Sequence, residues 1–253
     1  MITKRKFLLG VTAVIFTVFE ALMFYMIHIA NVDTDLNLRY ISIIAAVIFS
    51  WLTFFIELFS AGNQDGRISD VIFSKTNGNL IRIAMLFTLV ADYFLVALDE
   101  PNNLAGVIVF LGTQFFIFLH IFLNDASAEA RTINIIVRLV LMLTLIVLAY
   151  SILGEDADSL ALISVIYYAN LSANLIFANR IGRGGMVLTI GLILFALCDI
   201  NVGLSGLESI YTGGFPEGSF LYNIMNTGYD LVWIFYIPSQ TLIPLTLIFI
   251  EDK

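Results

Sequence analysis

Cysteine, histidine and charged residues are all scarce in this sequence of 253 residues. The single cysteine, Cys198, excludes an intrachain disulfide and any multi-cysteine zinc or iron–sulfur site. The two histidines, His28 and His120, are too few for a histidine-rich metal cluster. Only 13% of the residues are charged, and nothing in the sequence supports nucleic-acid binding. We therefore expect no metal, no cofactor, no nucleic acid and no protein partner.

Several well-known motifs are missing as well. The sequence has no G-x-S-x-G nucleophile elbow, no H-E-x-x-H metalloprotease motif and no Walker phosphate-binding loop. The four lysines lie at the termini or in expected loops, so no lysine is available inside a late helix for a retinal Schiff base. The missing lysine excludes a light-driven rhodopsin, and none of the other three motifs is present to support its class.

Apolar residues make up 60% of the chain, and the mean hydropathy of +0.96 is far too high for a water-soluble domain of this length. A helix needs about 20 apolar residues to cross a hydrocarbon core of about 30 Å. Eight stretches meet this requirement. They are roughly residues 7–30, 40–60, 80–98, 104–123, 131–153, 159–178, 185–206 and 229–250. The sequence predicts an all-α integral membrane protein with eight transmembrane helices in a single polytopic domain, residues 1–253.

The loop charges predict the orientation of these helices. If the N-terminus is cytoplasmic, all of the 12 lysines and arginines except Arg39 fall on the cytoplasmic side or at adjoining helix ends. The opposite loops carry acids such as Asp99, Glu155 and Glu217. We expect a multi-pass protein of the cell membrane with both termini in the cytoplasm.

The two halves of the chain show a weak similarity, about residues 7–123 against 131–250. The third span contains Leu86-Phe87-Thr88-Leu89-Val90-Ala91-Asp92, and the seventh contains Leu194-Phe195-Ala196-Leu197-Cys198-Asp199. In the fourth and eighth spans, Phe110-Leu111-Gly112-Thr113-Gln114 aligns with Tyr236-Ile237-Pro238-Ser239-Gln240. Two four-helix units in tandem share one orientation, so a 4+4 repeat is consistent with eight spans.

Two acids lie deep inside the predicted membrane spans. At 1.5 Å rise per residue, Asp92 lies roughly 18 Å and Asp199 roughly 21 Å from the cytoplasmic start of its helix. An ionised carboxylate at such depth costs at least ~2.5–3.5 kcal/mol. Each must face the interior of the bundle, find a partner or stay protonated, and any of these makes it a candidate for a functional site. Gln114 and Gln240 also lie within the membrane.

Polar residues follow two helical faces that could meet these acids. The eighth span carries Asp230, Trp233, Tyr236 and Gln240, and the sixth carries Ser164, Tyr167, Asn170 and Asn174. The first span adds Glu20. Such faces predict a polar interior around the acids, although the same side chains also serve as hydrogen-bonding contacts between helices. Arg82 and Arg138 are expected to reach back to lipid phosphates. Glu57 and His120 lie near cytoplasmic ends, where snorkelling or Arg131 could satisfy them.

Asp92, Asp199 and the stretch Tyr236-x3-Gln240, together with the eight spans, carry a resemblance to a known family. The chain resembles the lysoplasmalogenase (YhhN-like) family of eight-helix membrane hydrolases over nearly its whole length. It departs from the family in having Ala91-Asp92 and Cys198-Asp199 where members have Gly-Asp and Ser-Asp. Members also carry a histidine in the fourth helix, which corresponds here to Gln114 or to His120.

The resemblance implies hydrolysis of the vinyl-ether bond of lysoplasmalogens, with a lysophospholipid substrate taken from the bilayer. Protonation of the alkenyl carbon needs a buried acid, and the resulting cation needs an anion nearby. Two aspartates in a low dielectric can supply both, so we expect Asp92 and Asp199 to be the catalytic pair, in either order. The expected substrate-binding residues are Gln114, Tyr236, Gln240, Asn170, Asn174, Asp230, Glu20 and His120. A phosphate entering from the cytoplasmic side would meet Arg131, Arg180 and Lys75.

Two other functions remain open from the sequence. A proton- or ion-coupled carrier of small solutes would use the same membrane acids, tandem repeats and a helix broken by Pro238 and Pro244. A lipid-binding or scaffold protein would perform no turnover.

Overall fold

The computed structural model describes residues 2–30, 37–62, 76–125, 127–210, 216–227 and 229–249. Within these ranges every regular element is helical. The main helices are α1 (Ile2–His28), α2 (Asn37–Gly62), α4 (Thr76–Asp92), α5 (Asn103–Asn124), α6 (Ala128–Leu153), α7 (Ser159–Ala178), α8 (Arg183–Ile210), α9 (Phe220–Met225) and α10 (Leu231–Phe249). A π-helical turn, Tyr93–Ala97, follows α4, and short 3-10 turns, Gly154–Asp156 and Asn179–Ile181, follow α6 and α7.

Eight of the described helices, all but α9, are long and apolar enough to cross a membrane, which confirms the eight predicted spans. The protein is therefore an all-helical, multi-pass membrane protein. Its orientation in the membrane stays a prediction, as does the division into two repeats. The short helix α9 in the loop before the last span was not predicted.

The helix borders follow from local capping. Asn102, Ser127 and Asp158 precede α5, α6 and α7, and each side chain accepts a hydrogen bond from the backbone N–H three residues further on. These bonds satisfy donors that the first turn of a helix leaves without partners. At the end of α6, Gly154 adopts a φ of 58°, a conformation that glycine adopts at little steric cost. The starts of α5, α6 and α7 are therefore specified by the residues that precede them.

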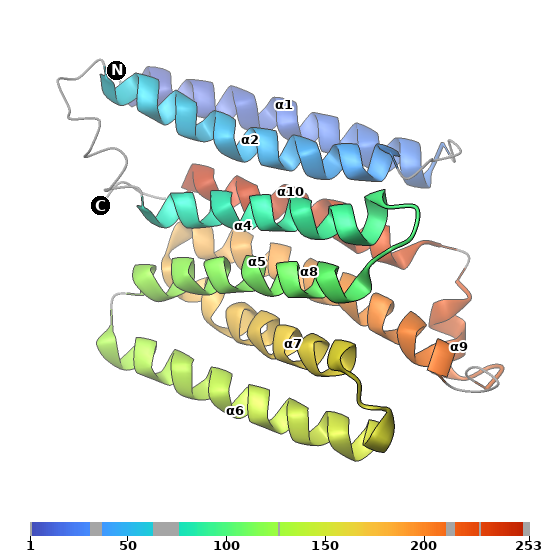
Figure 1. Ribbon diagram of the computed structural model, residues 1–253. Coiled ribbons are helices and arrows are strands. Elements are labelled where there is room, and N and C mark those ends of the chain that lie inside the picture. The colour runs from blue at the N-terminus through green and yellow to red at the C-terminus, as the bar shows by residue number, and fades with distance from the viewer. Residues whose placement is uncertain are drawn as a thin grey trace.

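Four helices occupy the centre of the bundle, namely α4, α5, α8 and α10, with α1 and α2 on one side and α6 and α7 on the other (Figure 1). The most extensive packing is between α4 and α5 and between α8 and α10. Contacts of α5 with α7 and of α10 with α2 join the two halves of the chain. The predicted acids and glutamines therefore lie on the central helices.

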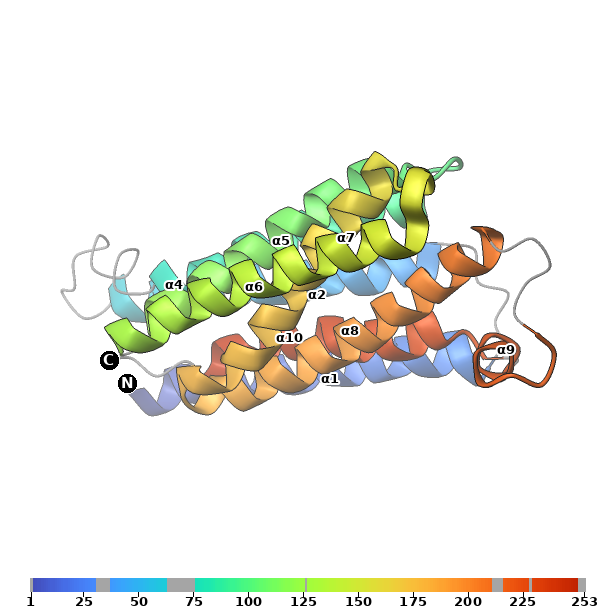
Figure 2. The same cartoon turned by 90° about the horizontal axis from the view of Figure 1, so that it is seen from below.

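The outermost helix, α6, lies along one edge of the bundle and contacts chiefly α7 (Figures 1 and 2). It exposes a row of large apolar side chains, including Ile136, Leu143 and Val147. Exposed apolar surface of this extent is unfavourable in water but is the normal lipid-facing surface of a membrane helix. At one end of the bundle lies α9, together with the end of α1 and the starts of α2 and α10; we call this the α9 end (Figure 2).

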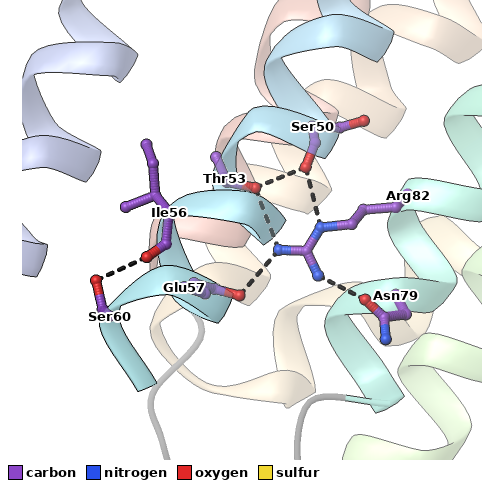
Figure 3. A network of polar contacts seen from close by, with 7 residues as sticks. All are labelled: Ser50, Thr53, Ile56, Glu57, Ser60, Asn79 and Arg82. Atoms are coloured by element: carbon purple, nitrogen blue, oxygen red, sulfur yellow. Dashed lines mark hydrogen bonds and ion pairs between the residues drawn. The ribbon is translucent and has the colours of Figure 1, made fainter. Parts of the chain in front are cut away.

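Arg82 on α4 is fully buried and turns toward α2 rather than toward lipid phosphates, so the prediction that it reaches the membrane surface is wrong (Figure 3). Its Nε donates to the backbone oxygen of Ser50 at 2.9 Å, and its Nη2 lies 3.1 Å from Glu57 Oε2. Nη2 also donates to Thr53 at 3.2 Å, and Nη1 donates to Asn79 at 2.8 Å. The guanidinium thus connects α2 to α4 because burial in the bundle leaves protein atoms as its only partners.

Pro238 and Pro244 lie inside α10, and the helix continues from Leu231 to Phe249 through both of them. The expectation of a proline-broken helix is therefore wrong. Thr241, between the two prolines, donates to the backbone oxygen of Ile237 at 2.8 Å. The helix persists through both prolines because it is packed against α8, α2 and α1.

Removing Arg82 is expected to destabilise the fold strongly. Arg82→Met takes the cation away from buried Glu57, which costs about 3–5 kcal/mol in the free energy of unfolding, whereas Arg82→Met with Glu57→Leu recovers most of that loss. Reversible unfolding in mixed detergent micelles measures both. Arg180→Met is the control, since the Arg180 side chain is 47% exposed at 3.6 Å from Asp125. Equal losses in the free energy of unfolding for Arg82→Met and Arg180→Met would contradict a structural role for the buried Arg82–Glu57 pair.

Candidate functional site

Asp92 is the last residue of α4, immediately before the π-helical turn, and its side chain is buried. The hydroxyl of Tyr236 on α10 donates to Asp92 Oδ2 at 2.5 Å. Tyr236 is itself buried. Single π-helical turns occur often at functional sites, because they change the direction in which the neighbouring side chains point. The first predicted acid therefore lies inside the bundle with a hydroxyl donor from the last helix.

Asp199 on α8 has a corresponding arrangement with a different helix. The hydroxyl of Tyr167 on α7 donates to Asp199 Oδ2 at 2.5 Å. The neighbouring Tyr168 hydroxyl donates to the backbone oxygen of Asp199. Asp199 is half-buried, whereas Asp92 is only 2% exposed. Each acid thus has one tyrosine hydroxyl on Oδ2, but the two carboxyl groups differ in their access to the surroundings.

A row of aromatic rings connects the two aspartate–tyrosine pairs. The ring centroids of Tyr167 and Phe110 are 6.1 Å apart, those of Phe110 and Phe195 are 5.6 Å apart, and those of Phe195 and Tyr236 are 5.6 Å apart. Trp233 continues the row, edge-on to Tyr236 at 5.3 Å. These spacings are typical of favourable aromatic pairs. The row forms a continuous series of ring contacts from one aspartate–tyrosine pair to the other.

Gln114 and Gln240 lie one helical turn further from the α9 end than Phe110 and Tyr236 respectively. Both are fully buried. Gln240 Nε2 donates weakly to Ser239 at 3.3 Å, while Gln240 Oε1 and Gln114 Nε2 have no hydrogen-bond partner among the described residues. Buried polar atoms are nearly always paired, so one unpaired acceptor and one unpaired donor indicate room for bonds to water or to a ligand.

The two asparagines predicted for this site bind Arg138 instead of the acids. Arg138 on α6 donates to Asn170 Oδ1 at 2.6 Å and to Asn174 Oδ1 at 2.9 Å. Asn174 Nδ2 donates in turn to the side-chain and backbone oxygens of Gln114, both at 2.9 Å. The Arg138 guanidinium lies over the Phe118 ring, 4.3 Å from its centroid. Arg138 therefore points into the bundle, contrary to the expectation that it reaches lipid phosphates.

The other predicted binding residues have other partners. Glu20 on α1 accepts a hydrogen bond from Ser42 on α2. His120 is buried near the end of α5, where Asn124 Nδ2 donates to its backbone oxygen at 2.8 Å. Asp230 at the start of α10 lies 2.6 Å from Arg39 on α2. The structure thus gathers Asp92, Asp199 and Tyr236 around the aromatic row and holds Glu20, His120 and Asp230 by separate contacts.

Tyr167 was on the predicted polar face of the sixth span but not among the predicted site residues. Its three-residue spacing from Asn170 was the available signal, because residues three apart share a helix face. What the spacing could not indicate is which helix would supply its partner.

The model of the YhhN family matches residues 68–247, from just before α4 almost to the end of α10. The chain belongs to the YhhN family. This family includes lysoplasmalogenases, and the resemblance found in the sequence is confirmed at the level of the family. Asp92, Asp199 and Tyr236 all lie within the matched range, whereas α1 and α2 lie outside it. No curated protein and no solved structure matches the chain.

In this YhhN family member, loss of a tyrosine hydroxyl from either pair is expected to destabilise the bundle. Tyr236→Phe and Tyr167→Phe each leave a carboxyl group in the membrane without one donor, at a cost of about 1–3 kcal/mol in the free energy of unfolding. Unfolding in mixed micelles measures the loss, with Tyr25→Phe on the exposed face of α1 as the control. The assignment fails if all three variants unfold alike.

Proposed function

We propose that the protein hydrolyses the vinyl-ether bond of lysoplasmalogens, with Asp92 and Asp199 as the reacting pair. Family membership supports the substrate class, since the YhhN family includes lysoplasmalogenases. The observation that carries the mechanism is the pair of carboxyl groups in the bundle, each with a tyrosine hydroxyl on one oxygen, and the row of ring contacts that joins the two aspartate–tyrosine pairs.

The reaction needs one proton donor and one anion. A carboxylic acid of the pair gives its proton to the outer carbon of the vinyl ether, whose double-bond electrons form the new C–H bond. The inner carbon and the ether oxygen then share the positive charge as an oxocarbenium ion. The carboxylate of the partner stabilises this cation, and it does so more strongly in an apolar interior than in water.

Water completes the reaction. It adds to the inner carbon and gives up a proton to the carboxylate that the first step produced, which restores the acid. The resulting hemiacetal loses the glycerophospho-alcohol by cleavage of its C–O bond, while its hydroxyl proton moves to the departing oxygen, and a fatty aldehyde remains. No cofactor is needed, because the oxidation state of the atoms involved does not change overall.

The surrounding residues have supporting roles in this proposal. Tyr236 and Tyr167 hold the carboxyl groups by one oxygen each and so fix the direction of the other oxygen. The unpaired Gln240 Oε1 and Gln114 Nε2 orient the water or the glycerol hydroxyl. The row of rings between the pairs supplies an apolar surface against which an alkenyl chain can pack.

Replacing either acid by its amide is expected to abolish turnover. Asp92→Asn and Asp199→Asn each remove one of the two charges or protons that the reaction requires, so aldehyde release from a lysoplasmalogen in detergent should fall by at least about 100-fold. A coupled aldehyde assay measures this, and thermal unfolding checks that the variants are folded. Asp125→Asn is the control, because Asp125 is a buried acid at the far end of α5.

Two results would contradict the proposal. Normal aldehyde release from both single variants would exclude the mechanism. Absence of aldehyde from the native protein, combined with solute uptake into proteoliposomes that depends on an ion gradient, would favour the carrier instead.

A further inference from the structure

A second polar cluster lies at the α9 end, where the end of α1 and the starts of α2 and α10 meet. Arg39 Nη2 lies 2.6 Å from Asp230 Oδ2, and the Arg39 guanidinium lies over the Trp233 ring, 5.1 Å from its centroid. His28, the last residue of α1, lies at the same end of the bundle, where α1 packs against α10. We call His28, Arg39, Asp230 and Trp233 the end cluster.

The end cluster has bonding capacity that the protein does not use. Arg39 Nε and His28 Nε2 are both buried and have no hydrogen-bond partner among the described residues. At the same time the Arg39 side chain is 22% exposed and that of Asp230 37% exposed, so a ligand can reach the pair. Buried nitrogen atoms without partners are rare, and the Arg39 guanidinium, whose Nε–H is one of them, is suited to the oxygens of a phosphate.

The cluster leads directly to the proposed catalytic pair. Trp233 contacts Arg39 on one side and Tyr236 on the other, and Tyr236 donates to Asp92. From Asp230 to Tyr236 the helix rises about 9 Å, at 1.5 Å per residue. In an extended lysoplasmalogen the phosphorus and the alkenyl carbon are about six bonds apart, which spans about 7–8 Å at bond lengths of about 1.5 Å. A phosphate on Arg39 therefore places the vinyl ether at the depth of Asp92.

We propose that the end cluster binds the zwitterionic phospho-amino-alcohol headgroup of the lysolipid, with its phosphate on Arg39 and its ammonium on Asp230. The two charges of the cluster match the two charges of such a headgroup, whereas a purely anionic ligand would be repelled by Asp230. This inference rests on the proposed function. It also assigns lipid entry to the α9 end.

The basic residues at the opposite end are less suited to this role. The Arg131 guanidinium lies 5.8 Å from the centroid of the Phe122 ring, and Arg180 is 3.6 Å from Asp125. On α5, Phe122 lies 12 residues beyond Phe110 of the aromatic row, a rise of about 18 Å. A phosphate held there is too far from the acids. Lys75, the third basic residue considered from the sequence, lies outside the described residues.

Binding of a stable analogue tests the inference without requiring turnover. The probe is a 1-O-alkyl-lysophosphocholine, which has the headgroup but no vinyl ether, and the reference is the 1-O-alkylglycerol with the same chain. Arg39→Gln is expected to weaken binding of the lysophosphocholine by about 10- to 100-fold and to leave binding of the alkylglycerol unchanged. Unchanged affinity for the lysophosphocholine would overturn the proposal. Arg180→Gln is the matched control at the other end of the bundle.

A charge swap separates a binding role from a structural one. Arg39→Asp combined with Asp230→Arg keeps an ion pair between α2 and α10, so its thermal stability should exceed that of Arg39→Asp alone. Because the swap reverses the two charges, it should not restore binding of the lysophosphocholine. Full recovery of binding by the swap would show that the pair only holds the helices together and would overturn the proposal.

Soluble competitors distinguish a headgroup from free phosphate. Glycerophosphocholine is expected to displace the lysophosphocholine at concentrations where inorganic phosphate does not. Equal competition by inorganic phosphate would identify a phosphate site and overturn the headgroup assignment.

If the lysophosphocholine binds as expected but no aldehyde forms, the proposed reaction fails while the headgroup site stands. If Arg39→Gln releases aldehyde as fast as the native protein does, the headgroup site fails while the proposed reaction stands.

Discussion

A polar group inside a membrane has no water to bond to, and the whole arrangement of this protein depends on that constraint. Each buried carboxyl, guanidinium or amide must find a partner on another helix, since leaving it without one costs several kcal/mol. Asp92 takes Tyr236, Asp199 takes Tyr167, Arg82 takes Glu57, and Arg138 takes two asparagines. These few contacts determine which faces of six helices point inward.

The same constraint explains why polar residues separate into distinct groups. Charges of opposite sign meet where they can neutralise each other, as at Arg82 and Glu57 between α2 and α4. The two acids keep neutral partners instead, so neither carboxyl is neutralised by a basic side chain through the contacts described above. A carboxyl group held by a hydroxyl can still exchange its proton, whereas one held by a guanidinium is committed to the ionised form. This difference separates a structural acid from one that is available for chemistry.

The sequence predicted the eight spans well, because they depend on local hydrophobicity and on counting residues along one helix. It also placed Tyr167, Asn170 and Asn174 on one face, as helical spacing requires. It failed where the partner comes from another helix. Arg82 and Arg138 were expected to reach lipid phosphates, because depth alone does not reveal that a side chain faces inward toward Glu57 or toward the asparagines. Likewise, spacing placed Asn170 and Asn174 on a face that could meet the acids, and it could not reveal that the helix beside them supplies an arginine.

The two acids differ in the helix that supplies their hydroxyl donor and in their burial, and the predicted alignment of the two halves relates this difference to one position. In that alignment Tyr236 on α10 corresponds to Phe110 on α5, and Phe110 has no hydroxyl to donate. In this alignment α5 has the place beside Asp199 that α10 has beside Asp92. Through Phe110, α5 contributes an aromatic ring to the row, and the hydroxyl donor to Asp199 comes from Tyr167 on α7. Asp92 is left deeply buried beside Trp233 and the end cluster, whereas Asp199 is half-buried. A reaction that needs one acid and one anion requires two carboxyl groups in unequal surroundings, and Asp92 and Asp199 differ both in burial and in the helix that supplies the hydroxyl donor.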